Sequence, residues 1–320
     1  MQHSSKKLVV SHAPFWHDGS SLAARHYNIL LVALIPAIAG ILTYGVPALA
    51  VVCLSVSTAM LWELLINRVS KTPVSVGDGN AALVGLLLAM LLPATTPWWM
   101  VITGTFVAIV IAKQIFGGLG ANPFNPALIS LAILGVSWPA FVDFNYMLAD
   151  YETGFNMVYP MWSAKYFGSA SVAGFTPMDL LMGKQAGGIG ATFGLGILIG
   201  GIYLMVRGYI RWEIAVSFLA GVFVTALVFN LSKPADYAGP VFHLLTGYTL
   251  IGAFFLATED SSSPVNFVPM LIYGAAGGLL TVLIRNIGVH VDGVVFAILV
   301  INLINPLVDK IRPKAMGKVA

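Results

Sequence analysis

Apolar residues gather in long runs along this chain, and polar residues gather in the stretches between the runs. Ten runs have the length that crosses a bilayer as a helix, roughly 20 residues or slightly fewer. The pattern therefore predicts an all-α polytopic membrane protein with ten transmembrane helices. These helices are expected at Tyr27–Tyr44, Pro47–Asn67, Ala81–Thr95, Trp98–Phe116, Phe124–Trp138, Thr192–Val206, Glu213–Asn230, Val241–Thr258, Val268–Arg285 and Gly293–Val308. Several are short and end at Gly or Pro, which is typical of broken helices around a site at membrane depth.

One long polar stretch divides these helices into five and five, so the two halves enter the membrane from opposite sides. This arrangement predicts two inverted five-helix repeats. Weak internal similarity supports it, because Gly79–Gly85 resembles Leu245–Gly252 and Asn122–Pro126 resembles Asn302–Pro306. Small and apolar residues also recur by chance in any membrane bundle, which is the alternative explanation. The predicted units are a segment at 1–26, a first repeat at 27–138, a loop at 139–191, a second repeat at 192–309 and a tail at 310–320.

Composition strengthens the assignment to a membrane. Charged residues make up 9% of the 320 residues, against about 25% in ordinary soluble domains, and hydrophobic residues make up 58%. The single cysteine, Cys53, excludes disulfides, four-cysteine zinc sites and iron–sulfur clusters ligated by this chain alone. Basic residues are scattered between apolar runs, so the net charge of +3 does not indicate nucleic-acid binding.

The distribution of Lys and Arg predicts the orientation, because basic residues are retained on the cytoplasmic side of a membrane. With the N-terminus inside, twelve of the sixteen basic residues face the cytoplasm and four face outward, so both termini are expected in the cytoplasm and the loop at 139–191 outside. The inner group is Lys6, Lys7, Arg25, Arg68, Lys71, Lys113, Arg207, Arg211, Lys310, Arg312, Lys314 and Lys318; the outer group is Lys165, Lys184, Lys233 and Arg285.

Few ionisable residues fall within the predicted helices, where they would indicate function. Glu63 and Lys113 lie near cytoplasmic ends, where their side chains are expected to reach the interface. Asp292 lies at a helix entrance, and His243 and His290 lie near outer boundaries, where a hydrogen-bonded interfacial role is expected before a proton relay. The sequence offers no catalytic group and no metal site of its own.

The outward loop is rich in aromatic residues interleaved with acidic ones. Such a loop either forms an interfacial aromatic belt or provides a surface that docks another protein or a flat ring system. The aromatic residues are Trp138, Phe141, Phe144, Tyr146, Tyr151, Phe155, Tyr159, Trp162, Tyr166 and Phe167.

This loop ends in the glycine-rich segment Gly183–Gly194, in which three glycines in four residues predict an exposed and deformable backbone. Thr192 stands where the sixth helix is expected to begin. A helix start offers free N–H groups and a positive dipole end, which together bind phosphate. Thr192 as an ordinary N-cap is the alternative, and the residues alone leave both open.

Three motifs carry a resemblance to a known family. They are Gly187-Gly188-Ile189-Gly190-Ala191-Thr192, Asn122-Pro123-Phe124-Asn125-Pro126 and Ala257-Thr258-Glu259-Asp260. Over nearly its whole length the chain resembles the RnfD/NqrB family of membrane flavoprotein subunits. The resemblance implies FMN joined covalently through its phosphate to Thr192 on the outer face.

The resemblance further implies that the backbone at Gly188, Gly190 and Ala191 surrounds the FMN phosphate. A noncovalent riboflavin is also implied, with Asn80 and Asn125 as its contacts. The attachment motif as often written has Ser or Thr three residues before the threonine and an acidic residue six before it. Here these positions are Ile189 and Ala186, which departs from that pattern.

By the same resemblance the chain is a subunit of a ferredoxin:NAD oxidoreductase in the bacterial inner membrane that exports Na⁺ or H⁺. Its expected partners are the Rnf subunits A, B, C, E and G, which bind ferredoxin and NAD. A channel or facilitator for a small neutral solute is the competing hypothesis, because inverted repeats without charge at the membrane centre also suit that function.

Overall fold

The computed structural model describes residues 21–151, 155 and 157–311, and within them the chain is helical with no strand. The N-terminal segment to residue 20 and the tail from residue 312, with the basic residues predicted there, lie outside the described residues. The α-helices are α1 Leu22–Tyr44, α2 Val46–Val69, α3 Asn80–Leu91, α4 Trp98–Phe106, α5 Pro126–Ser137, α6 Phe144–Met147, α7 Pro160–Phe167, α8 Pro177–Leu181, α9 Gly194–Val206, α10 Trp212–Ser232, α11 Pro240–Leu245, α12 Thr249–Ile251, α13 Phe267–Asn286 and α14 Val294–Val308.

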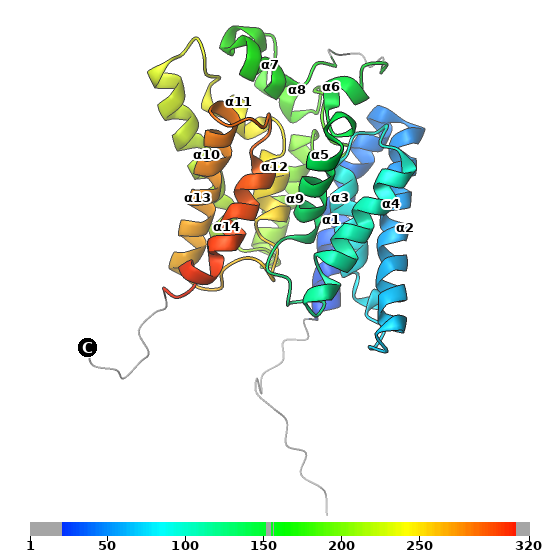
Figure 1. Ribbon diagram of the computed structural model, residues 1–320. Coiled ribbons are helices and arrows are strands. Elements are labelled where there is room, and N and C mark those ends of the chain that lie inside the picture. Colours follow the sequence, from blue (N-terminus) through cyan, green and yellow to red (C-terminus); the bar gives the residue numbers. More distant parts are fainter. Residues whose placement is uncertain (1–20, 152–154, 156, 312–320) are drawn as a thin grey trace, which may run out of the picture.

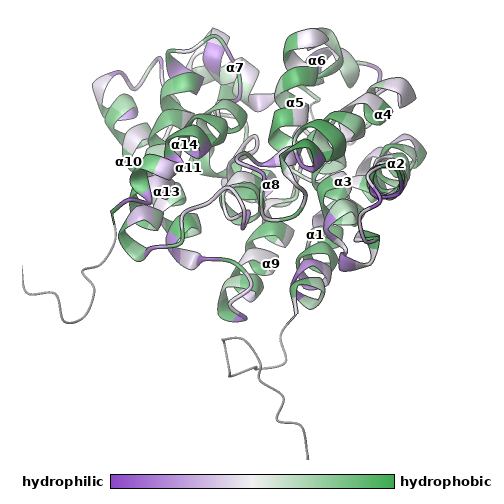
Figure 2. Cartoon of the chain, turned by 60° about the horizontal axis from the view of Figure 1, so that its bottom comes forward, coloured by the Kyte–Doolittle hydropathy of each residue, from purple (hydrophilic) through white to green (hydrophobic). Residues whose placement is uncertain are grey.

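Short 3₁₀ and π segments complete the chain. They are η1 Val76–Asp78, η2 Val107–Ile111, η3 Gln114–Phe116, η4 Pro139–Phe141, η5 Ser169–Val172 and η6 Gly252–Leu256, of which η2 and η6 are π-helical. Because η2 and η3 continue α4, that helical stretch runs on to Phe116. Five stretches are long and apolar enough to cross a membrane: Leu22–Tyr44, Val46–Val69, Trp98–Phe116, Trp212–Ser232 and Phe267–Asn286. Hydrophobic residues run along most of the helices (Figure 2), and many of the large hydrophobic side chains on them are exposed. The protein is therefore a multi-pass membrane protein.

The third apolar run of each half is interrupted, as the Gly and Pro positions predict. Helix α3 ends at Leu91, and Leu92 is extended ahead of Pro93. In the second half, α11 ends before Gly247, and α12 then continues into η6. Gly79 and Gly247 precede α3 and α12 with φ of 76° and 63°, a left-handed conformation that glycine adopts without strain.

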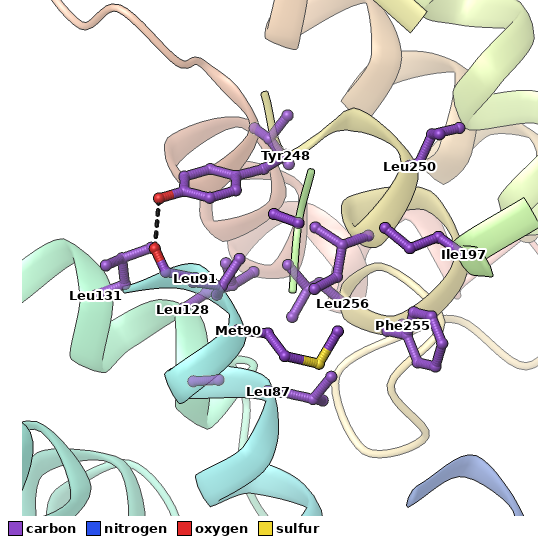
Figure 3. Packing of buried hydrophobic residues seen from close by; sticks show 14 of the residues in the cluster. Leu87, Met90, Leu91, Leu128, Leu131, Ile197, Tyr248, Leu250, Phe255 and Leu256 are labelled. Atoms are coloured by element: carbon purple, nitrogen blue, oxygen red, sulfur yellow. Dashed lines mark hydrogen bonds between the residues drawn. The ribbon is translucent and has the colours of Figure 1, made fainter. Parts of the chain in front are cut away.

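The two halves meet along a buried apolar seam at the end of α3 (Figure 3). The Tyr248 hydroxyl donates to the Leu91 carbonyl at 2.6 Å, and Met90 and Leu256 lie fully buried in the same cluster. Asn125 links the halves again, because its Nδ2 donates to the Leu256 carbonyl at 3.0 Å. The seam holds the region between residues 183 and 194 in place.

Helices α6, α7 and α8 lie together at one end of the molecule, opposite the end where α1 begins and α14 finishes (Figure 1). They belong to the long connection between α5 and α9. The long outward loop of the prediction is thus a folded cap over one end of the helices.

The expectation for Glu63 and Lys113 is wrong. Their side chains do not reach an interface, because each is only 1% exposed and Lys113 Nζ lies 2.8 Å from Glu63 Oε1. Ser75 also donates to Glu63 Oε1, at 2.7 Å. Two opposite charges from α2 and the end of the α4 stretch neutralise each other in the interior, which the sequence pattern did not indicate.

Replacing Lys113 with Met should destabilise the protein strongly, because Glu63 would remain buried without its cation. Breaking a buried pair in this way costs about 3–5 kcal/mol. The double variant Glu63→Leu/Lys113→Met should recover much of that loss, since it buries no charge. Thermal unfolding midpoints in detergent measure both effects, and equal midpoints for the wild type and Lys113→Met would contradict the account.

Candidate functional site

The glycine-rich segment between α8 and α9 runs along the end of α3. The Ile189 N–H donates to the Leu92 carbonyl and the Gly190 N–H donates to the Met90 carbonyl, both at 3.1 Å. These two bonds satisfy backbone carbonyls that lack a helical partner because α3 is interrupted. Their pattern is similar to a short stretch of strand pairing. The segment is thereby fixed to the seam between the halves.

The prediction of an exposed, deformable backbone is wrong, because every residue from Gln185 to Thr192 is buried. The glycines serve close packing. A Cβ on Gly188 would lie 2.5 Å from the Met90 carbonyl oxygen, and one on Gly190 would lie 2.5 Å from the Met90 side chain. Across the segment, a Cβ on Gly40 of α1 would meet the Ile189 carbonyl oxygen at 1.6 Å. Backbone therefore touches backbone where any side chain would intrude.

Thr192 precedes α9 without capping it. The helix begins at Gly194 with Phe193 at the cap position, so the N-cap interpretation of Thr192 is wrong. The Thr192 carbonyl accepts from the Gly194 N–H at 2.8 Å. The residue is 7% exposed. What distinguishes it is the hydroxyl.

In the described part of the chain, the Thr192 hydroxyl donates to no acceptor. The other buried threonines behave differently, because each donates to a backbone carbonyl: Thr96, Thr105, Thr246, Thr249, Thr258 and Thr281. A hydroxyl that donates no hydrogen bond within the protein is free to bond solvent or to be replaced by a substituent. Thr192 is thus the buried threonine whose oxygen is free to carry a substituent.

Donors for a phosphate lie in the same segment. Across the residues that the structure describes, the backbone N–H groups of Gly187, Gly188 and Thr192 meet no acceptor. The start of α9 follows directly, with the free N–H groups and positive dipole end of a helix N-terminus. Lys184 is turned to Asp179 at 3.0 Å on the surface, so dipoles and not a lysine would neutralise the phosphate. These residues fit a phosphoester on Thr192.

The two positions that depart from the usual motif are core residues. Ile189 is fully buried and Ala186 is 1% exposed, and both pack in the main hydrophobic cluster. A hydroxyl or a carboxylate at these positions would need polar partners in the core. The apolar side chains of Ile189 and Ala186 therefore suit the hydrophobic core in which they lie.

Asn80 and Asn125 line one cavity of about 190 Å³ near the start of α1, together with His26, Asn122 and Glu259. Asn125 is largely committed within the protein. Its Oδ1 caps α5 by accepting from Ala127 and Leu128, and its Nδ2 holds Leu256. Small-molecule pockets usually begin at roughly 300 Å³, so this cavity accommodates only part of a riboflavin.

A buried network beside the glycine-rich segment was not predicted. Arg285, completely buried, pairs with Asp292 at 2.9 Å and donates to the His243 carbonyl at 2.9 Å. Asp292 also accepts from the Tyr248 N–H at 2.7 Å and from the Tyr159 hydroxyl at 3.3 Å. Burial raises the pKa of Tyr159 well above its usual value, so the phenol stays protonated as the donor. The available signal was an Arg at the end of an apolar run and an Asp seven residues later.

A family model described as NQR2, RnfD, RnfE matches residues 9–317. This chain belongs to the NQR2/RnfD/RnfE family. The family resemblance carried by the sequence motifs is thereby confirmed.

Members of the NQR2/RnfD/RnfE family are similar to this chain from end to end. The D subunit of the ion-translocating oxidoreductase complex of Cronobacter sakazakii is 35% identical, and the match covers 96% of this chain and 98% of that protein. The D subunit of the proton-translocating ferredoxin:NAD(+) oxidoreductase complex of Clostridium ljungdahlii is 33% identical over 95% and 94%. The corresponding D subunit from Yersinia pseudotuberculosis serotype O:1b is 35% identical over 97% and 98%.

Replacing Gly188 with Ala should disturb the seam, because the new methyl would displace the Met90 carbonyl. Overpacking of this kind costs typically about 1–3 kcal/mol. Gly174→Ala is the matched control, since a Cβ there meets nothing within 4 Å. Thermal midpoints and size-exclusion profiles in detergent compare the two variants. Equal stability of both would show that the tight contact does not constrain the segment.

Proposed function

We propose that this chain is the flavin-bearing membrane subunit of an ion-translocating ferredoxin:NAD oxidoreductase, with FMN attached through its phosphate to Thr192. The observation that carries the proposal is that, among the described residues, the Thr192 hydroxyl meets no acceptor and lies beside N–H groups without acceptors and a helix start. Family membership and the names of the relatives supply the reaction.

The proposed topology has ten crossings in two inverted repeats, with the units at 27–138 and 192–309. Helices α3 and α12 correspond in it, because each follows a left-handed glycine, Gly79 before α3 and Gly247 before α12. Each half also buries one ion pair near the end of its fourth crossing, Lys113 with Glu63 and Arg285 with Asp292. The basic residues favour cytoplasmic termini and an outward cap at 139–191 in the inner membrane.

In this site the chain positions a carrier and keeps it from diffusing away. Thr192 supplies the anchoring oxygen, Gly187 and Gly188 supply N–H donors, and Gly188 and Gly190 permit the approach to α3. Gly190 and Ala191 contribute backbone around the phosphate, although their own N–H groups already bond Met90 and Gly188. When bound, FMN exchanges electrons singly or in pairs.

Transfer between ferredoxin and NAD requires other subunits in this proposal. One cysteine cannot ligate an iron–sulfur cluster, and in the described residues no group of three or more His, Cys, Asp and Glu is placed to hold a metal ion. The Rnf subunits A, B, C, E and G are proposed to bind ferredoxin and NAD and to complete the path that drives Na⁺ or H⁺ export.

Riboflavin at Asn80 and Asn125 is a further part of the proposal. It is supported by the shared cavity of these two residues. Asn80 has more capacity to bind it than Asn125, because its amide makes one long contact, 3.4 Å to His26 Nε2. No electron-transfer step is assigned to this site.

Thr192→Val should abolish covalent flavin, because it removes the hydroxyl and nearly preserves the shape of the side chain. Wild-type protein made with a flavin transferase should show a fluorescent band on a denaturing gel, and the Val variant should not. Thr192→Ser keeps an oxygen and should retain some label.

The matched control is Thr258→Val, another buried threonine, whose hydroxyl is bonded to Phe254; its band should remain. A dark wild-type band, from cells shown to flavinylate another protein, would overturn the assignment to Thr192. Flavin released into the denatured supernatant reports the noncovalent site, and Asn80→Ala should reduce it.

Orientation is tested by cysteine labelling in a Cys53→Ser background. Asp150→Cys in the cap should react with an impermeant maleimide on intact spheroplasts, because residues 139–191 are proposed to face outward. Lys71→Cys, between α2 and α3, should react only after the membrane is opened. The reverse pattern would invert the topology and remove the outward flavin site.

A further inference from the structure

We infer that an aromatic cavity beside Thr192 is the seat of the flavin ring system; this rests on the proposed attachment of FMN to Thr192. The aromatic cavity has a volume of about 310 Å³ and lies between α5, α7 and the start of α14. Its volume is at the lower end of the usual range for small-molecule pockets. It is larger than the cavity at Asn80 and Asn125.

The aromatic cavity adjoins the attachment segment directly. Phe144, Tyr159 and Tyr248 line it, and the same three residues also line the narrow gap next to Gly187, Gly188 and Thr192. One layer of aromatic side chains therefore separates the Thr192 hydroxyl from the cavity. A ring tethered by a phosphate and a five-carbon ribityl chain needs to pass only this layer.

Of the three aromatic residues in this layer, Phe144 is the one whose side chain can move aside. The Tyr159 and Tyr248 hydroxyls are held by Asp292 and by the Leu91 carbonyl. The Phe144 ring is held by packing alone, at centroid distances of 5.0 Å to Tyr159 and 6.1 Å to Tyr248. A rotamer change of Phe144 opens the gap without breaking a hydrogen bond.

The walls of the aromatic cavity suit a flat, uncharged ring. Trp162 and Tyr166 of α7 pack at 5.2 Å on one side, and His290 stacks on Phe296 at 4.0 Å on the other. Lys165 ties the two sides together, because its Nζ donates to the Gly288 and His290 carbonyls at 2.6 Å each. Flat rings gain from stacking between such surfaces.

Charge fixes which end of the cofactor enters. Asp143 and Asp292 line the aromatic cavity; among the described residues Asp292 pairs with the cation of Arg285, and Asp143 has no cationic partner. These carboxylates oppose a phosphate in the cavity, whereas the N–H groups near Thr192 favour it there. The phosphate thus remains at Thr192 and the ring occupies the aromatic cavity.

Gly135 on α5 provides the test, because it lines the aromatic cavity and a Cβ there meets nothing within 4 Å. Gly135→Phe should fill the cavity without disturbing backbone. In the purified complex we expect the covalent band on the gel to persist while iodide quenching of the native flavin fluorescence increases severalfold. Gly174→Phe, in the same outward cap but away from the cavity, is the control and should match wild type.

Trp162→Leu is the second variant, for use if Gly135→Phe does not fold. It removes one stacking surface, so native flavin fluorescence should rise severalfold relative to the denatured value, with an unchanged band. Wild-type fluorescence and iodide quenching in either folded variant, with the band intact, would overturn the assignment of the ring to this cavity. A missing wild-type band would instead refute the attachment of FMN to Thr192, and with it the assignment of the flavin ring to the aromatic cavity.

Discussion

Backbone contact between the end of α3 and the segment before α9 is the constraint on which the rest of the site depends. Leu92 and Met90 accept hydrogen bonds from Ile189 and Gly190, so the segment before α9 is joined to the interior of the first half. The contact is possible only because positions 188 and 190 lack side chains. Once it forms, Thr192 is held where its hydroxyl meets no acceptor among the described residues, next to the aromatic layer of Phe144, Tyr159 and Tyr248.

Two buried ion pairs link helices on the two sides of this seam, one pair in each half. The Glu63–Lys113 pair ties α2 to the end of the α4 stretch, and Arg285–Asp292 ties α13 to the start of α14. In each pair, a partner of opposite charge takes the place of the water that would otherwise solvate the charged group. A buried charge is tolerated only with such a partner. Asp292 has a second role, because its carboxylate also accepts hydrogen bonds from the Tyr248 backbone N–H and the Tyr159 hydroxyl. The same carboxylate therefore stabilises the fold and shapes the aromatic cavity.

Much of the fold could be predicted from the sequence, because lipid imposes long apolar helices and Gly and Pro interrupt them at visible positions. Both ends of α10 and α13 were predicted within two residues, whereas α1 begins five residues before its predicted start. The site was only partly predictable. A motif singled out Thr192 as a candidate, but the burial of this residue depends on contacts with residues about 100 positions away, which the motif does not indicate. The prediction for Glu63 and Lys113 failed for the same reason, because 50 positions separate the two residues and their pairing is not visible in the sequence. Their positions near the ends of apolar runs alone favoured an interfacial location.

The burial of Thr192 carries a consequence for biosynthesis. If FMN is attached to Thr192 as proposed, the attaching enzyme would have little access to a residue that is 7% exposed while Gln185–Thr192 lies packed against α3. Attachment would then compete with the closing of the seam. Access requires either a nascent chain whose second half has not yet docked, or a local opening that breaks the Ile189–Leu92 and Gly190–Met90 bonds. Chains that close first become slow substrates. The fraction of mature protein that carries the cofactor would then depend on the rate at which the seam closes relative to the rate of cofactor attachment. Gly188 and Gly190 affect the first rate, because they permit the close contact with α3.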